Sequence, residues 1–302
     1  MKNIIVRLAN GLGNQLFTYA AAFNLAKKNN ANLLIDDESG FYKRYKFELN
    51  NFKLTAKIAE NKFKYKGHIG RLKRKLLKKL KFLKKDLIFI EEKKLEDKFT
   101  MFDSSIFDIK IEHNAYVEGY FQSEKYFKSV EKLILKEFEF KDEIKNKPNK
   151  FKDLILKSNS ISIHIRKNKF LIDENHKDIE VLNNENLNLN LETAKKGIKF
   201  FENKFENSKF FVWSDNFSGL RDHFPSNKFV FVDENLNLSP IYDLYLMSLC
   251  KNFIVSPSTF HYWGSFLSKN PNKICLSPPF IKNKSGYYGF SNNKDIKPGW
   301  WV

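Results

Sequence analysis

The chain has 302 residues, of which 42% are hydrophobic and 16% aromatic, and its formal net charge is +18. This length supports one large domain or two ordinary ones with a substantial core, and the composition excludes a disordered chain. The excess of positive charge predicts an anionic partner, namely nucleic acid, acidic lipid or a phosphorylated small molecule.

Two features indicate where the protein works. Its two cysteines, Cys250 and Cys275, are too few for a disulfide framework or a conventional zinc site, which favours a reducing compartment. No apolar run approaches the roughly 18 residues of a membrane span. We therefore expect a cytoplasmic protein, with peripheral attachment to the inner membrane surface left open.

The first motif is N-G-L-G-N-Q-L-F at residues 10–17, which lies between an apolar run at residues 4–6 and a helical pattern. This order predicts a strand, a glycine turn and a helix whose first amides suit an anionic ligand. A dinucleotide fingerprint is excluded because Leu16 occupies its third glycine position. Instead, Asn14 and Gln15 are expected to face a ligand, and the alternative is a plain turn before a capped helix.

The first half of the chain opens with a βαβ pattern, which favours a parallel sheet. Apart from one basic helix, residues 42–98 are expected to be irregular. The predicted elements are strands at 4–8, 32–35 and 116–121, a helix that begins near residue 12, and a helix from about 124 to 138.

The basic helix covers residues 71–85, which contain nine cations and no anion. Apolar residues recur at spacings of three and four and form one stripe on this helix; they are Ile69, Leu72, Leu76, Leu80 and Leu83. Three interpretations stay open. The helix docks on its own domain, it lies on an anionic membrane surface, or it binds nucleic acid.

The second half follows a polar linker at residues 141–150 and alternates strands with helices, which again predicts a parallel sheet. Residues 173–192, rich in Asn and Glu, are expected to form a surface excursion without chemistry. The predicted strands are 161–165, 210–213, 229–232, 253–255 and 273–276, and the helices are 151–156, 191–205, 241–250 and 261–267.

The strongest candidate site is S-I-S-I-H-I-R at residues 160–166. Strand alternation places His164 and Arg166 on one face, at the carboxyl end of a strand, where open α/β sheets bind ligands. An arginine fork grips phosphate, and Lys167 and Lys169 add positive charge. The alternative is an ordinary strand end with two polar residues.

Two further strand ends carry polar groups. In S-P-S-T-F-H-Y-W-G at residues 256–264, Ser258 or Thr259 caps a helix whose free amides suit a phosphate, or serves as a cap alone. Asp215 ends another strand, where it is expected to accept hydrogen bonds from a ribose or from guanine, or to cap the following helix.

Several patterns are missing from the sequence. There is no Asp-x-Asp clip for a metal-bound nucleoside diphosphate, no P-loop, no G-x-S-x-G elbow and no histidine spacing typical of a metal site. Fixed cations and amides are therefore expected to hold a leaving pyrophosphate without a metal or another cofactor.

Six motifs in chain order resemble glycosyltransferase family 11, chiefly bacterial α-1,2-fucosyltransferases that use GDP-fucose. Together they span nearly the whole chain. They are G-L-G-N-Q-L-F at 11–17, G-Y-F-Q at 119–122 with Tyr126-Phe127, H-I-R at 164–166, W-S-D at 213–215, D-L-Y-L-M-S-L-C at 243–250 and S-T-F-H-Y-W-G at 258–264.

The resemblance implies an α/β fold of the GT-B type, in which two Rossmann-like domains with parallel sheets face an interdomain cleft. It also implies metal-independent transfer of fucose, with inversion, to a galactoside hydroxyl of a surface glycan. The expected boundaries are an acceptor-side domain at 1–145 with a basic helical insertion at about 57–94, a donor domain at 150–285 and a tail at 286–302.

The resemblance also assigns site residues and partners. Arg166 would bind the donor pyrophosphate and act in catalysis, and the remaining donor-binding residues would be Gly13, Asn14, His164, Asp215, Ser258, Thr259 and Phe260. The partners would be a GDP-sugar and an oligosaccharide or lipid-linked glycan, with no nucleic acid and with membrane contact through residues 71–85 left open. No general base is assigned, although Asp36 and Asp37 end a strand of the first domain.

One departure from the family pattern leaves alternatives open. Family members usually continue the His-x-Arg motif with Arg-Gly-Asp-Tyr, whereas this chain has Lys167-Asn168-Lys169-Phe170. Lysine lacks the planar fork of arginine, and Lys169 reverses the charge of the usual Asp. One alternative is a transferase that uses a different GDP-sugar. Another is a basic RNA- or lipid-binding protein without enzymatic activity.

Overall fold

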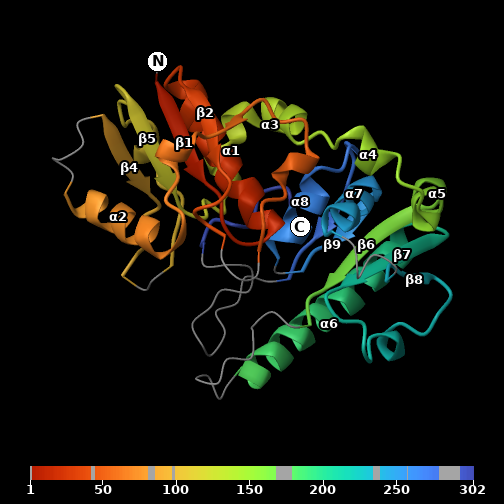
Figure 1. Ribbon diagram of the computed structural model, residues 1–302. Helices are drawn as coiled ribbons and strands as arrows, with labels where there is room; N and C mark the ends of the chain where they lie inside the picture. Colours follow the sequence, from red (N-terminus) through yellow and green to blue (C-terminus); the bar gives the residue numbers. More distant parts are fainter. Residues whose placement is uncertain are drawn as a thin grey trace. The chain divides into compact units, whose positions relative to one another are not determined.

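The computed structural model describes residues 2–41, 45–80, 86–96, 99–167, 179–233, 239–256, 258–278 and 293–302. It contains two compact units (Figure 1). The first comprises Met1–Lys141 with Asn292–Ile296, and the second comprises Asp142–Ser291 with Lys297–Val302. The end of the chain therefore contributes a short segment to each unit.

The first unit contains a five-stranded sheet in the order β3-β2-β1-β5-β4, in which every neighbouring pair is parallel. Its central strand is apolar on both faces, with Ile4, Ile5 and Val6 fully buried, as expected where helices cover both sides. The elements are β1 (Asn3–Arg7), α1 (Leu12–Lys28), β2 (Asn32–Asp36), β3 (Lys57–Ile58), α2 (Gly67–Lys79), β4 (Leu87–Glu91), β5 (Asn114–Glu118) and α3 (Glu131–Glu137).

Two expectations for the first unit are wrong. Residues 42–98 are not irregular outside the basic helix, because β3 and β4 lie within them and extend the sheet at both edges. The helix expected from 124 to 138 is instead two 3₁₀ turns followed by α3. The backbone leaves helical geometry at Phe127, with φ of −133° and ψ of 5°, and again at Val130, with φ of −120° and ψ of 20°, which divides the segment into three pieces.

The second unit contains a five-stranded sheet in the order β10-β9-β6-β7-β8, also parallel throughout. The predicted α/β class with two parallel sheets is therefore confirmed. The elements are α4 (Asp142–Lys145), α5 (Lys150–Lys157), β6 (Asn159–Ile165), α6 (Ile179–Lys204), β7 (Ser208–Ser214), β8 (Phe229–Phe231), α7 (Ile241–Leu249), β9 (Asn252–Ile254), α8 (Thr259–Phe266) and β10 (Cys275–Leu276).

Alternation along β6 separates a core face from a polar face. Ile161, Ile163 and Ile165 join the hydrophobic core under α6, which lies along the sheet in Figure 1. The intervening Ser162 and His164 are buried among polar partners. The strand therefore holds a polar line inside the unit, and this line leads to the candidate site.

In the second unit, the long helix α6 differs from the sequence prediction. Residues 179–192, which fall in the predicted surface excursion, form its first turns, and Asn186 and Asn190 are buried there. The remaining residues of that excursion, 173–178, lie outside the described residues. The segment 141–150, expected as a linker, likewise contains α4 and begins α5.

Helix α8 is fixed closely to α7. A Cβ atom on Gly264 would lie 3.0 Å from the Cβ of Met247 and 3.1 Å from its sulfur atom, so only glycine allows this approach without displacement. The amino end of α8, which carries three of the candidate residues, is thus held by tight packing one turn further along. Within the described part of the chain, no helix is both long and apolar enough to span a bilayer.

Candidate functional site

The strand order of the second unit reverses between β6 and β9, which makes this point its topological switch point. A buried side-chain hydrogen bond links the two strands near their carboxyl ends, where His164 Nδ1 lies 2.6 Å from Ser256 Oγ. In open α/β sheets ligands bind at such a point, so the geometry supports the sequence prediction that selected His164.

A second histidine supports the first. The backbone N–H of Ser256 donates to His261 Nδ1 at 3.2 Å, and His261 Nε2 lies 3.0 Å from Ser162 Oγ. Because an amide can only donate, Nδ1 of His261 is the acceptor, and the proton of the neutral ring is on Nε2, which donates to Ser162. His261 is fully buried and therefore holds the turn that carries Ser256.

Burial keeps both rings uncharged. It lowers the pKa of His164 to about 4, an effect opposed by the Asp215 carboxylate and reinforced by the cationic Arg166. The pKa of His261 is lowered well below its usual value, chiefly by burial and then by His164. At neutral pH this site therefore presents neutral imidazoles beside one permanent cation, Arg166.

Arg166 follows the last residue of β6, and its backbone is tied to α6. Its carbonyl oxygen accepts a hydrogen bond from the side-chain amide of Asn186 at 2.8 Å and another from that of Asn190 at 3.4 Å. Within the described part of the chain, no hydrogen bond or ion pair engages its guanidinium group. The main chain at Arg166 is thus fixed against α6.

Sequence reasoning missed Asn186 and Asn190. Their spacing of four residues, within a run that also repeats leucine, was the signal that both share one helix face. Asn190 also donates to the carbonyl oxygen of Asn186 at 2.8 Å, so the two amides form one buried unit under the Arg166 loop.

Asp215 holds the segment that follows β6 by a hydrogen bond. Its Oδ1 accepts the backbone N–H of Lys167 at 2.8 Å, and Lys167 Nζ donates to the carbonyl oxygen of Ser218 at 2.6 Å. These contacts join the segments that follow β6 and β7. Neither sequence interpretation, a nucleoside contact or a helix cap, anticipated this bond. Residues 168–170, including Lys169, lie outside the described residues.

The turn after β9 carries the remaining candidates of the second unit. Ser258 is the N-cap of α8, and its Oγ accepts the backbone N–H of Phe260 at 3.2 Å. Thr259 is the first helical residue, so the expectation that one of the two caps the helix is settled in favour of Ser258. The ring of Phe260 lies 6.2 Å from that of His164, which brings this turn to the switch point.

In the first unit, Gly13 and Asn14 lie in the first turn of α1. The left-handed residue of this turn is Asn10, with φ of 64°, whereas Gly11 has φ of −70°. The strand, turn and helix are thus in the predicted order, and Asn10 adopts the left-handed conformation of the turn. The Oδ1 of Asn14 accepts a hydrogen bond from Gln122 Nε2 at 2.6 Å, across the switch point between β1 and β5.

Gln15 does not face a ligand, contrary to the sequence expectation. It is fully buried, and its Nε2 donates to the carbonyl oxygens of Asn10 and Lys46 at 2.8 and 2.9 Å. Its Oε1 accepts the backbone N–H of Glu48 at 3.0 Å. All of its hydrogen bonds hold the chain around residues 46–48 against α1.

Neither acidic residue at the end of β2 is positioned as a general base. Asp36 is fully buried, accepts the hydroxyl of Tyr116 and also accepts the backbone N–H of Ser39 at 2.9 Å. Asp37 forms an ion pair with Lys64 at 2.6 Å. Both carboxylates therefore stabilise the loop after β2.

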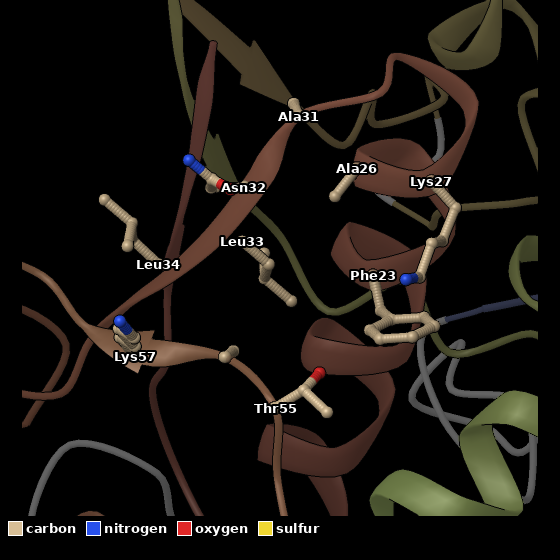
Figure 2. A pocket seen from close by; sticks show the side chains of 10 residues that line it. Phe23, Ala26, Lys27, Ala31, Asn32, Leu33, Leu34, Thr55 and Lys57 are labelled. Carbon is tan, nitrogen blue, oxygen red and sulfur yellow. The ribbon is translucent and has the colours of Figure 1, made fainter. Parts of the chain in front are cut away.

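A cavity of about 380 Å³ lies in the first unit, away from these residues (Figure 2). Figure 2 shows the side chains of Phe23 and Lys27 from α1 on one side and Lys57 on the other, with Leu33 of β2 and Thr55 between them. This cavity adjoins the amino end of β2 and the last turns of α1. Because ligands of parallel sheets bind at the opposite, carboxyl ends, it is not part of the candidate site.

No group of three or more His, Cys, Asp or Glu residues within the described ranges has the arrangement of a metal site. The groups gathered at the switch point of the second unit are instead hydrogen-bond donors, acceptors and a fixed cation. Such a set is suited to binding an anion at the carboxyl ends of the strands.

Comparison with known proteins adds to this geometry. The family model described as Glycosyl transferase family 11 matches residues 3–301. The O-antigen biosynthesis glycosyltransferase WbnK of Escherichia coli is 28% identical over 291 residues, covering 90% of this chain and 92% of WbnK. An alpha-1,2-colitosyltransferase of the same organism is 26% identical over 312 residues, covering 100% and 99% of the two chains.

Solved structures with this fold include fucosyltransferases. The NodZ alpha-1,6-fucosyltransferase of Bradyrhizobium, soaked with GDP-fucose, superposes with a TM-score of 0.53 at 16% identity and covers 91% of this chain and 94% of its own. The FUT1 protein of Arabidopsis thaliana, in complex with GDP, gives a TM-score of 0.58 at 13% identity and covers 98% and 74%. These similarities confirm the predicted GT-B type of α/β fold.

Proposed function

The chain belongs to glycosyl transferase family 11, and we propose that it transfers fucose from GDP-fucose to a galactoside hydroxyl of a surface glycan, in α-1,2 linkage. The transfer would invert the sugar's anomeric centre and need no metal. The family match over residues 3–301 supports a glycosyltransferase, and the solved fucosyltransferases, one of them soaked with GDP-fucose, support the donor. WbnK, described as an O-antigen biosynthesis enzyme, supports the acceptor class.

One observation carries the proposal. Arg166 stands at the switch point of the second unit with its main chain fixed by two asparagines, while no group in the described residues neutralises its guanidinium. When the glycosidic bond to the nucleotide breaks, negative charge builds up on the departing β-phosphate. A planar cation at this position would stabilise that charge.

The neutral His164 complements this cation. Its ring is held by Ser256, and the low pKa of His164 means that it adds no second positive charge at neutral pH. We assign it to the nucleotide-diphosphate pocket as a hydrogen-bonding group. Ser258, Thr259 and Phe260 would line the diphosphate and sugar from the start of α8, and Asp215 would border the nucleoside while it braces the Lys167 loop.

Bond breaking at the sugar is proposed to run ahead of attack by the acceptor hydroxyl, which gives the transition state oxocarbenium character. In this scheme the domain at 150–285 binds the donor, and the domain at 1–145 provides the acceptor side, with Gly13 and Asn14 reaching the donor. The tail at 286–302 completes the chain. The acceptor would be an oligosaccharide or a lipid-linked glycan.

A second donor is favoured by a specific observation. The colitosyltransferase relative matches this chain over its full length at nearly the same identity as WbnK. In addition, Lys167, Asn168 and Lys169 replace the residues usual after the His-x-Arg motif. A transferase for a different GDP-sugar, such as a colitose donor, is therefore the alternative.

Two measurements test the proposal. Calorimetry with GDP and UDP, in the presence of a chelator, should show binding of GDP at least about tenfold tighter than binding of UDP. Turnover with competing GDP-fucose, GDP-mannose and GDP-colitose, on a galactoside acceptor, should then favour GDP-fucose. Preference for another GDP-sugar supports the alternative donor, and equal binding of UDP and GDP contradicts both.

A further inference from the structure

Helix α2 exposes its apolar side chains and buries a charged one, the reverse of an ordinary surface helix. Ile69, Leu72 and Leu76 form a stripe at spacings of three and four, and they are 85%, 70% and 54% exposed. A helix on the surface of a globular protein normally turns such a stripe toward the core. Here the stripe faces away from the sheet, and a contiguous apolar surface on a monomer is typical of an interaction site.

The opposite side of α2 is charged and packs against the sheet. Arg74 is only 8% exposed, and its Nε lies 3.1 Å from Glu118 Oε1 at the end of β5. Lys78, one turn later, forms ion pairs with both Glu118 and Glu91. The ion pairs with the buried Glu118 orient the helix, because turning the apolar stripe inward would leave this carboxylate buried without a cation.

The helix is also anchored by close packing. A Cβ on Gly70 would lie 2.4 Å from the carbonyl carbon of Tyr65, so glycine is required for this approach, and Leu77 joins the small core around Tyr65 and Tyr116. Little conformational entropy therefore remains to be lost when the exposed stripe meets a partner.

The charge of helix α2 indicates which partner its apolar stripe contacts. The helix contains six Lys and Arg residues and no Asp or Glu, and Lys73, Lys75 and Lys79 are exposed beside the apolar stripe. An apolar stripe flanked by lysines matches the boundary between acyl chains and anionic headgroups. We propose that α2 docks on an anionic phospholipid bilayer, with Ile69, Leu72 and Leu76 inserted below the headgroups.

Other occupants fit less well. Single-stranded nucleic acid would engage the lysines, but the stripe offers aliphatic side chains and no aromatic ring on which bases could stack. A second copy of the chain would bring the exposed Lys73, Lys75 and Lys79 of two helices face to face, which is unfavourable. Spanning the bilayer is excluded for α2 by its 13 residues and its cations.

The test is co-sedimentation of the whole protein with vesicles of phosphatidylcholine alone or mixed with phosphatidylglycerol. It needs no donor or acceptor sugar, so its outcome is independent of the proposed transferase activity. We expect binding to the anionic vesicles that exceeds binding to the neutral ones at least about tenfold and weakens as salt is added.

Two variants separate the apolar and electrostatic contributions. The variant I69Q/L72Q/L76Q should lose at least about tenfold in vesicle binding, because three aliphatic side chains no longer enter the bilayer. The variant K73Q/K75Q/K79Q should lose about fivefold for each lysine and should show a weaker salt dependence. Since all six side chains are exposed, both variants are expected to fold, which circular dichroism checks.

The matched control is L133Q/L135Q/L156Q, which changes three other leucines that are 40%, 40% and 50% exposed and should leave vesicle binding unchanged. Three results would overturn the proposal. They are equal binding to neutral and anionic vesicles, undiminished binding by I69Q/L72Q/L76Q, and a wild-type dimer in light scattering that this variant abolishes. Binding of RNA at the expense of vesicles would instead assign the helix to nucleic acid.

Discussion

The two units have the same kind of switch point, but their polar groups are used differently. In the first unit, Asn14 bonds to Gln122, and Thr18 donates to the carbonyl oxygen of Gly119 at 3.0 Å, so the groups at the ends of β1 and β5 satisfy one another. In the second unit, burial keeps His164 neutral while Ser256 holds its ring, and the Arg166 guanidinium has no partner among the described residues.

This difference indicates which unit can stabilise the negative charge that develops on a leaving group. A set of mutually satisfied amides can border a bound donor but adds little stabilisation to a developing anion, whereas a permanent cation beside neutral imidazoles stabilises it. We therefore assign stabilisation of the leaving diphosphate to the second unit and shaping of the opposite side of the reaction to the first. The predictions below test this division, from the largest expected effect to the smallest.

Removal of Arg166 should have the largest effect. Arg166→Ala should lower kcat/KM for transfer by at least about 10²-fold, as expected for loss of a group that stabilises the leaving charge. Arg166→Lys should recover part of this loss, because lysine keeps the charge without the fork. Steady-state kinetics measures both.

The matched control for this experiment is Arg221→Ala. Arg221 is an exposed arginine of the same unit, paired with Asp233, and its loss should leave kcat/KM within about twofold of wild type. Similar losses in the two variants would remove the distinction on which the assignment rests.

Acid should destabilise the second unit. The folded-state pKa of His164 is about 4, below the value of about 6.5 in an unfolded chain, so the unfolded state binds the proton first. The stability linked to this neutral ring is present above pH 6.5 and is lost as the pH falls from about 6.5 to about 4, by on the order of 3 kcal/mol.

Tryptophan fluorescence in denaturant titrations checks this prediction selectively, because Trp213, Trp263, Trp300 and Trp301 all belong to the second unit. His164→Gln should flatten the dependence of the unfolding free energy on pH, and His223→Asn, which changes an exposed histidine, should preserve it. An unchanged slope in His164→Gln would assign the acid sensitivity to other groups.

Gln15 should matter for stability and little for chemistry. Gln15→Ala removes three hydrogen bonds and leaves the buried N–H of Glu48 without its acceptor, which should cost about 2 kcal/mol of unfolding free energy. Faster hydrogen exchange at the Glu48 amide would locate the effect.

Asn61→Ala, at an exposed position of the same unit, is the control for stability. Turnover per folded molecule of Gln15→Ala should stay within about threefold of wild type, because all the hydrogen bonds of Gln15 are structural. A loss of turnover as large as that of Arg166→Ala, without loss of stability, would place chemistry at this residue.

The sequence predicted the parts of the fold that local patterns encode. Strand alternation and the turns after strands located β6 and the ends of β7 and β9. His164 and Ser258 were selected as candidate residues because they lie at these strand ends. Neighbouring residues carry this information, because a strand end in a parallel sheet can be recognised without knowing its partners.

The rest depends on contacts between distant residues. The apolar stripe of α2 was visible in the sequence, but its outward direction is set by ion pairs with Glu118, which lies 40 or more residues further along the chain. The role of Gln15 likewise depends on the chain at Lys46 and Glu48. Local composition also gave no sign of the start of α6. Its asparagines are typical of a polar surface segment, but in the structure they donate hydrogen bonds to buried backbone groups.

The most direct test of the central claim is the titration of His164 by NMR, with carbon-labelled imidazole, in the absence and presence of GDP without divalent ions. His164→Gln assigns its signal, and the exposed His223 is the internal reference. If the diphosphate binds beside Arg166, its negative charge should raise the pKa of His164 by about one unit or more. A His164 titration unchanged at saturating GDP would contradict the account.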